Sequence, residues 1–271
     1  MEVTALMSDV VREAGAAILD IYNEDDHGVE IKADDSPLTR ADLAAHRIIV
    51  KELTRAMPEV PVLSEESTGI TWNERSKWDR YFLVDPLDGT KEFINRNGEF
   101  TVNIALVDNG VPVQGAVFVP VKDVLYLGDQ RAGVATVERE GNVKAIHCRA
   151  LDRNNPLTIV ASRRHGGEAL TRCLEVLQQH FDDIDTTNMG SSLKLCLVAE
   201  GKADLYPRLA PTSEWDTAAA HAVVEAAGGR VVDTAMQDLR YNQKEDILNP
   251  FFYVIADRTF DWPGILSTVE I

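Results

Sequence analysis

The stretch YFLVDPLDGTKEF (81–93) joins a hydrophobic run to an acidic turn. The residues from Tyr81 to Val84 are apolar and predict a buried strand, and the Pro, Gly and Thr that follow predict a turn. The carboxylates of Asp85 and Asp88 stand where this strand would end. Because open α/β architectures place ligand sites at strand ends, this segment is a candidate functional site.

Acidic residues also stand at two other predicted element boundaries. Glu65 and Glu66 follow a short predicted strand, Val60 to Leu63. Asp216 stands where a helix is expected to begin, and we expect Ser213 to cap that helix, which would place Asp216 in its first turn.

If these carboxylates converge, they need a counterion. Like charges about 4 Å apart repel by roughly 4 kcal/mol at an effective dielectric constant near 20, so a cluster without a cation would take up protons. Mg²⁺ prefers carboxylate oxygens together with the phosphate of a substrate, and the carbonyl of Leu87 is a further oxygen ligand between the two aspartates. Taken singly, each acidic feature also has an ordinary explanation as a solvated loop, a turn or a helix start. Their joint occurrence favours a metal site.

The N-terminal half predicts two amphipathic helices that cover an antiparallel sheet. Apolar residues recur at helical spacing in ALMSDVVREAGAAILDIY (5–22). The second helix, 39–57, begins with Thr39 as N-cap and Asp42 three positions later, a capping-box arrangement. From residue 101 to 146, β-rich runs are separated by turn signals such as Asp108-Asn109-Gly110, which predict hairpins.

The C-terminal half predicts alternating strands and helices, which indicates an α/β arrangement. The predicted strands are 157–162, 203–209, 230–232 and 251–257, and the predicted helices are 167–181, 191–201 and 214–229. We therefore expect an N-terminal α+β subdomain, 1–150, with most of the metal ligands, and a C-terminal α/β subdomain, 151–271, with Asp216 and the nucleotide-binding segments. No low-complexity linker separates them, so we expect them to pack tightly.

The overall charge limits the class of partner. The chain of 271 residues has a formal net charge of −17, and 45% of its residues are hydrophobic. A strongly acidic protein lacks the basic surface that a nucleic-acid polymer needs, so we expect no such partner. Small phosphorylated substrates stay open, because bound cations reverse the local sign of the charge.

The cysteines and the N-terminus bear on location. Cys148, Cys173 and Cys196 have no spacing typical of zinc, and their odd number indicates reduced thiols. The N-terminus lacks a signal-peptide pattern, and no apolar run reaches the roughly 18 residues of a membrane span. We expect a cytoplasmic protein; peripheral association with the inner membrane, and the choice between monomer and homodimer, stay open.

Three motifs occur together in family order: EES (65–67), DPLDGT (85–90) and WDTAAAHAVVEAAGG (215–229). With them the chain, from about residue 5 to 256, resembles the lithium-sensitive, magnesium-dependent phosphatases of the inositol monophosphatase superfamily. The segments 83–107 and 190–209 are most similar to its CysQ-type 3'(2'),5'-bisphosphate nucleotidase branch. Inositol phosphatases more often carry Thr-Asn-Phe after the Gly-Thr pair.

The resemblance implies a layered αβαβα sandwich, a cofactor of two or three Mg²⁺ ions, and in-line attack on phosphorus by a metal-activated water without a phosphoenzyme. Carried over residue by residue, the implied metal ligands are Glu65, Asp85, the carbonyl of Leu87, Asp88 and Asp216. Thr90 and Asp42 would orient or deprotonate the water, and Glu66 would stand nearby as a group that supports the ligands or holds a third metal; the implied catalytic residues are thus Asp42, Thr90 and Glu66. The groups implied to contact substrate are Glu65, Leu87, Asp88, Gly89, Thr90, Ser191, Ser192, Lys194, Arg208 and Asp216.

The substrate implied by the branch is adenosine 3',5'-bisphosphate, which is hydrolysed to AMP and phosphate in sulfate assimilation. The sulfated form of this nucleotide is a second implied substrate. A nucleotide with two phosphates needs a second anion site. Ser191, Ser192 and Lys194 lie near a predicted helix start, where unpaired N–H groups favour phosphate. Arg208 and the segment SRRH (162–165) add positive charge.

Other interpretations stay open at this point. An inositol or sugar phosphatase of the same superfamily would use the same metal ligands. A phosphatase with an aspartate nucleophile needs Asp-x-Asp, whereas the spacing here is Asp-x-x-Asp. A non-catalytic protein that senses metal or nucleotide is a further class. Lys194 and Arg208 also have an explanation as solvated surface charges.

Overall fold

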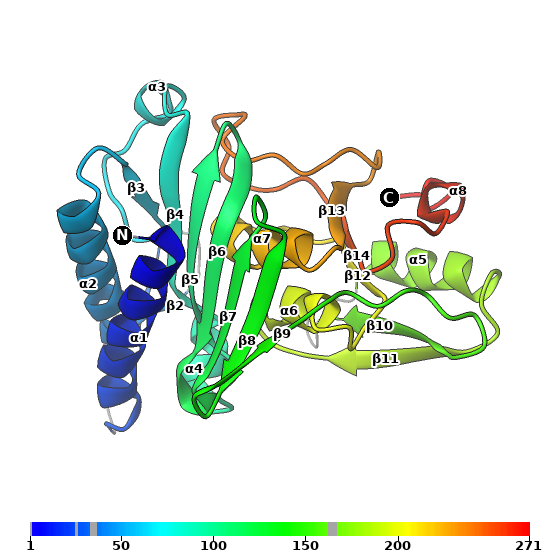
Figure 1. Ribbon diagram of the computed structural model, residues 1–271, viewed down its shortest axis with the longest axis horizontal. Coiled ribbons are helices and arrows are strands. Elements are labelled where there is room, and N and C mark those ends of the chain that lie inside the picture. Colours follow the sequence, from blue (N-terminus) through cyan, green and yellow to red (C-terminus); the bar gives the residue numbers. More distant parts are fainter. Residues whose placement is uncertain (1, 25–26, 33–36, 162–166) are drawn as a thin grey trace.

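The computed structural model describes residues 2–24, 27–32, 37–161 and 167–271. Helices and sheets alternate in layers, in the order helix, sheet, helix, sheet, helix (Figure 1). The αβαβα sandwich that the resemblance implied is confirmed. The segment SRRH, with Arg163, Arg164 and His165, lies outside the described residues. No helix within the described ranges is long and apolar enough to cross a membrane.

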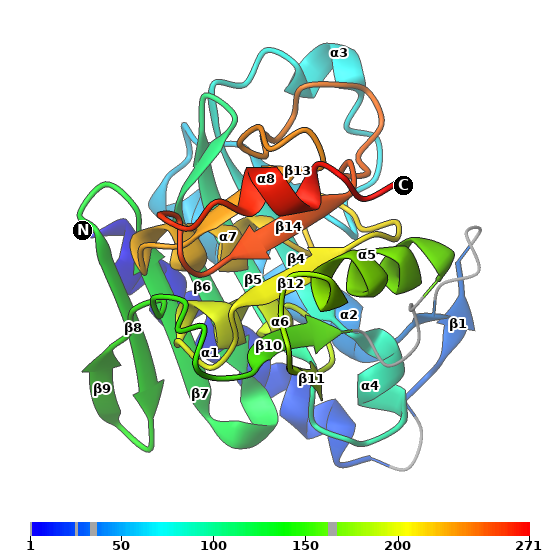
Figure 2. The ribbon, with the colours of Figure 1, turned by 90° about the vertical axis from the view of Figure 1, so that its right-hand side faces the viewer.

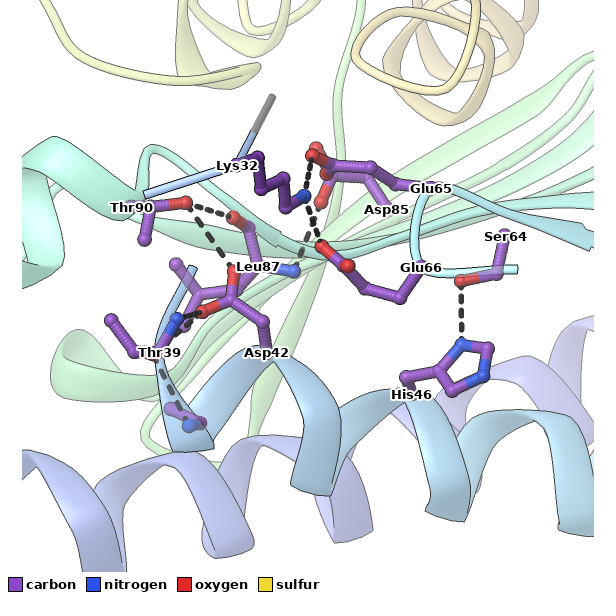
Figure 3. A network of polar contacts seen from close by, with 11 residues as sticks. Lys32, Thr39, Asp42, His46, Ser64, Glu65, Glu66, Asp85, Leu87 and Thr90 are labelled. Carbon is purple, nitrogen blue, oxygen red and sulfur yellow. Dashed lines mark hydrogen bonds and ion pairs between the residues drawn. The ribbon is translucent and has the colours of Figure 1, made fainter. Parts of the chain in front are cut away.

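The first layer consists of α1 (Val3–Tyr22) and α2 (Arg40–Ala56), which pack on each other and on one face of the first sheet. The predicted capping box is confirmed: the Thr39 side chain accepts a hydrogen bond from the Ala41 N–H, and the Asp42 carboxylate accepts one from the Thr39 N–H at 2.7 Å. This fixes Asp42 at the start of α2, where its carboxylate points toward the end of the neighbouring strand (Figure 3).

The first sheet has seven strands in sequence order: β3 (Val62–Ser64), β4 (Arg80–Asp88), β5 (Thr101–Asp108), β6 (Val111–Val119), β7 (Val124–Asp129), β8 (Val134–Arg139) and β9 (Asn142–Ala145). The predicted hairpins are confirmed, and the residues from Tyr81 to Val84 are buried as predicted. Strand β3, expected at 60–63, lies slightly later in the chain.

One pairing in this sheet differs from the predicted antiparallel pattern. Strand β3 runs parallel to β4, because the connection between them, which contains α3 (Trp72–Arg75), crosses over and returns the chain in the same direction. Both strands therefore end at the same edge of the sheet. That edge brings the residues after β3 close to the carboxylates that end β4.

The central layer consists of α6 (Leu193–Ala199) and α7 (Ala218–Ala226). Helix α7 lies directly on the sheet: a Cβ atom at Gly115 of β6 would lie 2.0 Å from the Ala219 carbonyl oxygen, and one at Gly128 of β7 would lie 2.5 Å from the Val223 Cα. Only glycine permits so close an approach. As a result, the segment before α7 is held against the first sheet.

The predicted start of α7 is wrong. The helix begins at Ala218 with Thr217 in the N-cap position, and Ser213 does not cap it. The Asp216 carboxylate instead accepts the N–H of Ser213 at 2.9 Å, so Asp216 lies in a turn that precedes the helix. Such local bonds from an aspartate to nearby backbone compete with helix formation.

The second sheet has the order β11-β10-β12-β14-β13, with bounds β10 (Leu157–Ala161), β11 (Ile184–Asn188), β12 (Leu205–Arg208), β13 (Arg230–Asp233) and β14 (Phe252–Ile255). Helices α5 (Glu168–Gln178) and α8 (Trp262–Leu266) lie on its outer face (Figure 2). Strand β11 was not predicted, because its sequence IDTTN is polar and residues 185–188 are exposed at the sheet edge.

Three buried apolar clusters hold the layers together. One lies between α1, α2 and the first sheet, and one lies under α5 and α8. The third lies between the sheets and includes Leu83 and Val117 from the first half of the chain and Tyr206 and Val254 from the second. The short elements β1 (Glu30–Ile31), β2 (Pro37–Leu38), α4 (Thr90–Ile94) and the 3-10 turn η1 (Pro120–Lys122) were not predicted.

Candidate active site

The structure brings together three aspartates from two distant segments. Asp85 and Asp88 belong to the end of β4, and Asp216 belongs to the turn before α7. Each offers a carboxylate oxygen that lies within 4.8 Å of the others. The convergence of these three, predicted from the sequence, is thus observed.

A bulge in β4 directs both of its aspartates to this cluster. Asp85 pairs with Asn103 and Asp88 pairs with Thr101, so three steps along β4 match two steps along β5. In a regular strand, residues three apart face opposite sides of the sheet. The additional residue restores the same side for both carboxylates.

The electrostatics of the cluster favour a cation. Burial raises the pKa of Asp85 well above its usual range, and the charges of Glu65, Asp88 and Asp216 raise it further. Burial also raises the pKa of Asp216 well above its usual range, and the negative charges of Asp88 and Glu65 raise it further. The three converging ligand atoms are all carboxylate oxygens, a set that suits a hard divalent cation such as Mg²⁺. The residues present therefore fit magnesium.

Glu65 and Glu66 are engaged by a lysine that the sequence analysis missed (Figure 3). The Lys32 Nζ donates to Glu65 Oε1 at 2.7 Å and to Glu66 Oε1 at 2.5 Å. Burial lowers the pKa of Lys32, but the two carboxylates outweigh that effect and raise it above its usual range. Lys32 directly follows β1, in a polar part of the sequence where no hydrophobic periodicity marks a functional residue.

Thr90 lies between Asp42 and the backbone of Leu87 (Figure 3). Its Oγ1 is 3.3 Å from Asp42 Oδ1 and 3.4 Å from the Leu87 carbonyl oxygen. Since the hydroxyl carries a single proton, it donates to one of these acceptors at a time. Asp42 Oδ2 accepts from the N–H and hydroxyl of Thr39, which leaves Oδ1 directed at Thr90. Burial raises the pKa of Asp42.

A pocket of about 320 Å³ adjoins the aspartate cluster. Its lining combines an acidic end, a backbone turn and a cationic wall, and it includes these predicted site residues: Asp88, Gly89, Thr90, Ser191, Ser192, Lys194, Arg208 and Asp216. The φ angle of Gly89 is +90°, a left-handed conformation that favours glycine at this turn.

The cationic wall of the pocket is formed by Lys194 and Arg208. Lys194 is only 8% exposed, which excludes the interpretation of this lysine as a solvated surface charge. Its Nζ donates to the Ser191 carbonyl at 2.7 Å, and burial lowers its pKa to about 8. The Arg208 guanidinium donates to the Thr212 hydroxyl and, at 2.7 Å, to the Pro211 carbonyl.

The two serines of the GSSLK segment differ in their surroundings. Ser191 has a left-handed φ of +46°, and its buried Oγ has no hydrogen-bond partner within the described part of the chain. Ser192 is engaged instead with the aspartates: its N–H and hydroxyl lie 2.5 and 2.6 Å from Asp88 Oδ2, and its hydroxyl lies 2.5 Å from the Asp216 carbonyl oxygen. The Ser191 hydroxyl thus has no partner among the described residues, whereas the Ser192 hydroxyl is engaged with both aspartate segments.

Sequence reasoning also missed Asn103, whose amide contacts Ser192 and Asp88. A signal for this residue was present. It is a polar side chain in the apolar run TVNIALV, and such residues are seldom buried without a partner.

Comparisons with known proteins bear on the whole chain. The family model described as the inositol monophosphatase family matches residues 1–258. The chain is 50% identical over 246 residues to the 3'(2'),5'-bisphosphate nucleotidase CysQ of Escherichia coli, covering 90% of this chain and 96% of that protein. It is 41% identical over 250 residues to CysQ of Buchnera aphidicola, covering 91% of each. The crystal structure of CysQ from Bacteroides thetaiotaomicron superimposes with a TM-score of 0.83 at 44% identity, covering 94% of this chain and 97% of that one.

Proposed function

The chain belongs to the inositol monophosphatase family, and from that premise we propose that it is a magnesium-dependent bisphosphate nucleotidase that hydrolyses the 3'-phosphate of adenosine 3',5'-bisphosphate to AMP and phosphate. The observation that carries the proposal is the pocket itself. Its lining includes Asp88 and Asp216 of the aspartate cluster, and it also includes the cations Lys194 and Arg208. A substrate with two separate phosphates matches two separate sites for anions.

The proposed holders of two or three Mg²⁺ ions are Asp85, Asp88, Asp216, Glu65 and the carbonyl of Leu87. Magnesium bound there would supply positive charge that polarises the phosphoryl group and lowers the pKa of water. Glu65 adds its charge to the cluster, since it contributes to the raised pKa of both Asp85 and Asp216.

Thr90 and Asp42 are the proposed route for the proton of the attacking water. The 3.3 Å separation of Thr90 Oγ1 and Asp42 Oδ1 allows the hydroxyl to accept a proton while it passes its own to the carboxylate. The raised pKa of Asp42 makes it a better proton acceptor than an exposed aspartate. We assign Glu66 a supporting role beside Glu65, in the same ion pair with Lys32.

The proposed contacts for the phosphate that is hydrolysed are backbone N–H groups of Gly89 and Thr90, at the turn where α4 begins. The second phosphate is assigned to Lys194, Arg208, Ser191 and the neighbouring Ser192. The unpartnered Ser191 hydroxyl supports this assignment, since a buried hydroxyl without a partner is costly unless a ligand supplies one.

Release of phosphate from a panel of compounds tests the proposal. The panel contains adenosine 3',5'-bisphosphate, its sulfated form, AMP, inositol 1-phosphate and fructose 1,6-bisphosphate, each with Mg²⁺ and with EDTA. We expect the highest kcat/KM on a bisphosphate nucleotide and no hydrolysis in EDTA. A higher kcat/KM on inositol 1-phosphate or the sugar bisphosphate would overturn the substrate assignment in favour of the alternative phosphatase. Nucleotide recycling in the cytoplasm during sulfate assimilation, and inhibition by lithium, belong to the same proposal.

A further inference from the structure

Asn103 is a buried polar residue in an otherwise apolar strand. It lies on β5, is 1% exposed, and has the buried neighbours Val102 and Ile104 in the chain. Burial of a carboxamide costs free energy unless its polar atoms are hydrogen-bonded. A residue of this kind needs a partner that offsets the cost.

The partners of Asn103 all lie toward the aspartate cluster. Its Nδ2 donates to Ser192 Oγ at 2.8 Å and lies 3.5 Å from Asp88 Oδ2. Its Oδ1 has no partner among the described residues. The carboxamide therefore acts on its surroundings through the Nδ2 donor.

The inventory of protons at Ser192 shows what this donor does. The Ser192 hydroxyl oxygen accepts from Asn103, and it has one proton of its own to donate. That proton faces two acceptors, Asp88 Oδ2 at 2.6 Å and the Asp216 carbonyl oxygen at 2.5 Å. With the Asn103 amide in place, the hydroxyl proton is directed away from β5 and toward these two segments. The Ser192 N–H, 2.5 Å from Asp88 Oδ2, holds the same oxygen.

We propose that Asn103 is a positioning residue for the metal site: through the Ser192 hydroxyl it fixes Asp88 and the segment of Asp216 relative to each other. The inference rests on the proposed function of these aspartates as magnesium ligands. Asp88 comes from β4 and Asp216 from the turn before α7, so no single element sets their separation. Ser192 joins them, and Asn103 orients Ser192. Groups that hold metal ligands in place typically change metal affinity by about 10–100-fold when removed.

The test compares Asn103→Leu, which keeps the size of the side chain and removes the donor, with Ser192→Ala and with the double variant. Magnesium affinity is measured without substrate, from the concentration of Mg²⁺ that gives half of its effect on the melting temperature. We expect each single variant to need about tenfold more Mg²⁺ or higher. The double variant should bind Mg²⁺ with the same affinity as Ser192→Ala alone, because Asn103 acts through Ser192. In hydrolysis by Asn103→Leu, kcat at a fixed, subsaturating Mg²⁺ concentration should fall while KM for the nucleotide changes less than about twofold, because Asn103 is not a proposed substrate contact.

Val107→Ala is the matched control. Val107 is buried on the same strand and the same face, in the core between the sheets, and has no contact with the aspartates, so it reports general loss of packing. It should lower the melting temperature without changing the Mg²⁺ midpoint. If Asn103→Leu does not fold, Asn103→Ala removes the same donor with a smaller side chain.

Two results would overturn the inference. The first is a wild-type Mg²⁺ midpoint in the Asn103 variants. The second is a double variant whose loss of Mg²⁺ affinity equals the product of the losses in the two single variants. Failure of the proposed function gives a different result. In that case the wild-type protein itself shows no Mg²⁺-dependent rise in melting temperature and no hydrolysis.

Discussion

Replacement of Asp85 by asparagine should stabilise the protein in EDTA and remove most of its response to Mg²⁺. The change is nearly isosteric. Asp85 Oδ1 accepts the Leu87 N–H at 2.9 Å, and the carbonyl oxygen of an asparagine keeps that bond. The substitution removes a buried negative charge that lies among other negative charges. The repulsion between them is thereby reduced, which favours the folded state when no cation is bound.

The size of the effect follows from the geometry. Charges on carboxylate oxygens 4.8 Å apart repel by about 3.5 kcal/mol at an effective dielectric constant of about 20. Asp85 has two such neighbours, but proton uptake limits the repulsion, since each unit of pKa shift corresponds to about 1.4 kcal/mol. We expect a gain of about 2–4 kcal/mol at about pH 8, which for 271 residues raises the melting temperature by about 4–8 °C.

The gain should depend on pH with a defined sign. The pKa of Asp85 in the folded protein is raised, so its protonated form contributes stability that is complete below the unfolded pKa of about 4. That stability is lost as the pH rises through the folded pKa. In EDTA, the difference between Asp85→Asn and wild type should therefore be small at about pH 4 and grow as the pH increases.

Melting temperatures in EDTA and in Mg²⁺, measured across this pH range, test the prediction. Asp182→Asn, on the exposed surface after α5, is the control for an equal change of net charge. The reasoning is refuted if Asp85→Asn melts at or below the wild-type temperature in EDTA at about pH 8, or if it keeps the full wild-type response to Mg²⁺.

Three further predictions concern the residues around the cluster. Lys32→Met removes the cation that pairs with the two glutamates after β3. The variant should therefore have a lower melting temperature in EDTA and reach half-saturation at a lower Mg²⁺ concentration. The control Lys77→Met, at an exposed lysine, should change neither the melting temperature nor the Mg²⁺ midpoint. Lys194→Ala should raise KM for the bisphosphate nucleotide more than it raises KM for inositol 1-phosphate, a small phosphomonoester; an equal rise in both KM values would contradict the second anion site. In the wild type, KM for the bisphosphate should rise above about pH 8, where Lys194 loses its charge, and this rise should be absent from the variant. Thr90→Val should lower kcat by about 100-fold or more while Thr90→Ser retains most of it, and similar kcat values for the two would exclude a proton path to Asp42.

Local signals in the sequence were sufficient for much of the fold. The capping box at Thr39 and Asp42 and the hairpin at Asp108-Asn109-Gly110 depend on residues only a few positions apart, and both are confirmed. The family, with its CysQ-type branch, was also identified from short motifs, and the comparisons confirm it. The acidic residues in those motifs led directly to the cluster of Asp85, Asp88 and Asp216.

The missed features depend on contacts between distant segments. The parallel pairing of β3 with β4 is set by a crossover, and the polar strand β11 is stabilised by its neighbour β10 and not by its own composition. Lys32 becomes part of the site only because the chain after β1 returns to the end of β3. For Asp216, a helix start was a reasonable expectation, but the bond to the Ser213 N–H could be seen only in three dimensions.

The position of the aspartates links metal binding to the packing of the two halves of the chain. Asp85 and Asp88 belong to the first sheet, whereas Asp216 and Ser192 follow residue 151 and belong to the segments around α6 and α7. A cation held by both sets would favour the arrangement in which these segments are packed together, so its binding free energy would add to the free energy of unfolding. Without it, repulsion within the cluster acts against the same docking. Substitutions that weaken metal binding should therefore reduce activity and Mg²⁺-dependent stability at the same metal concentrations, even when, like Asn103→Leu, they lie outside the ligand set.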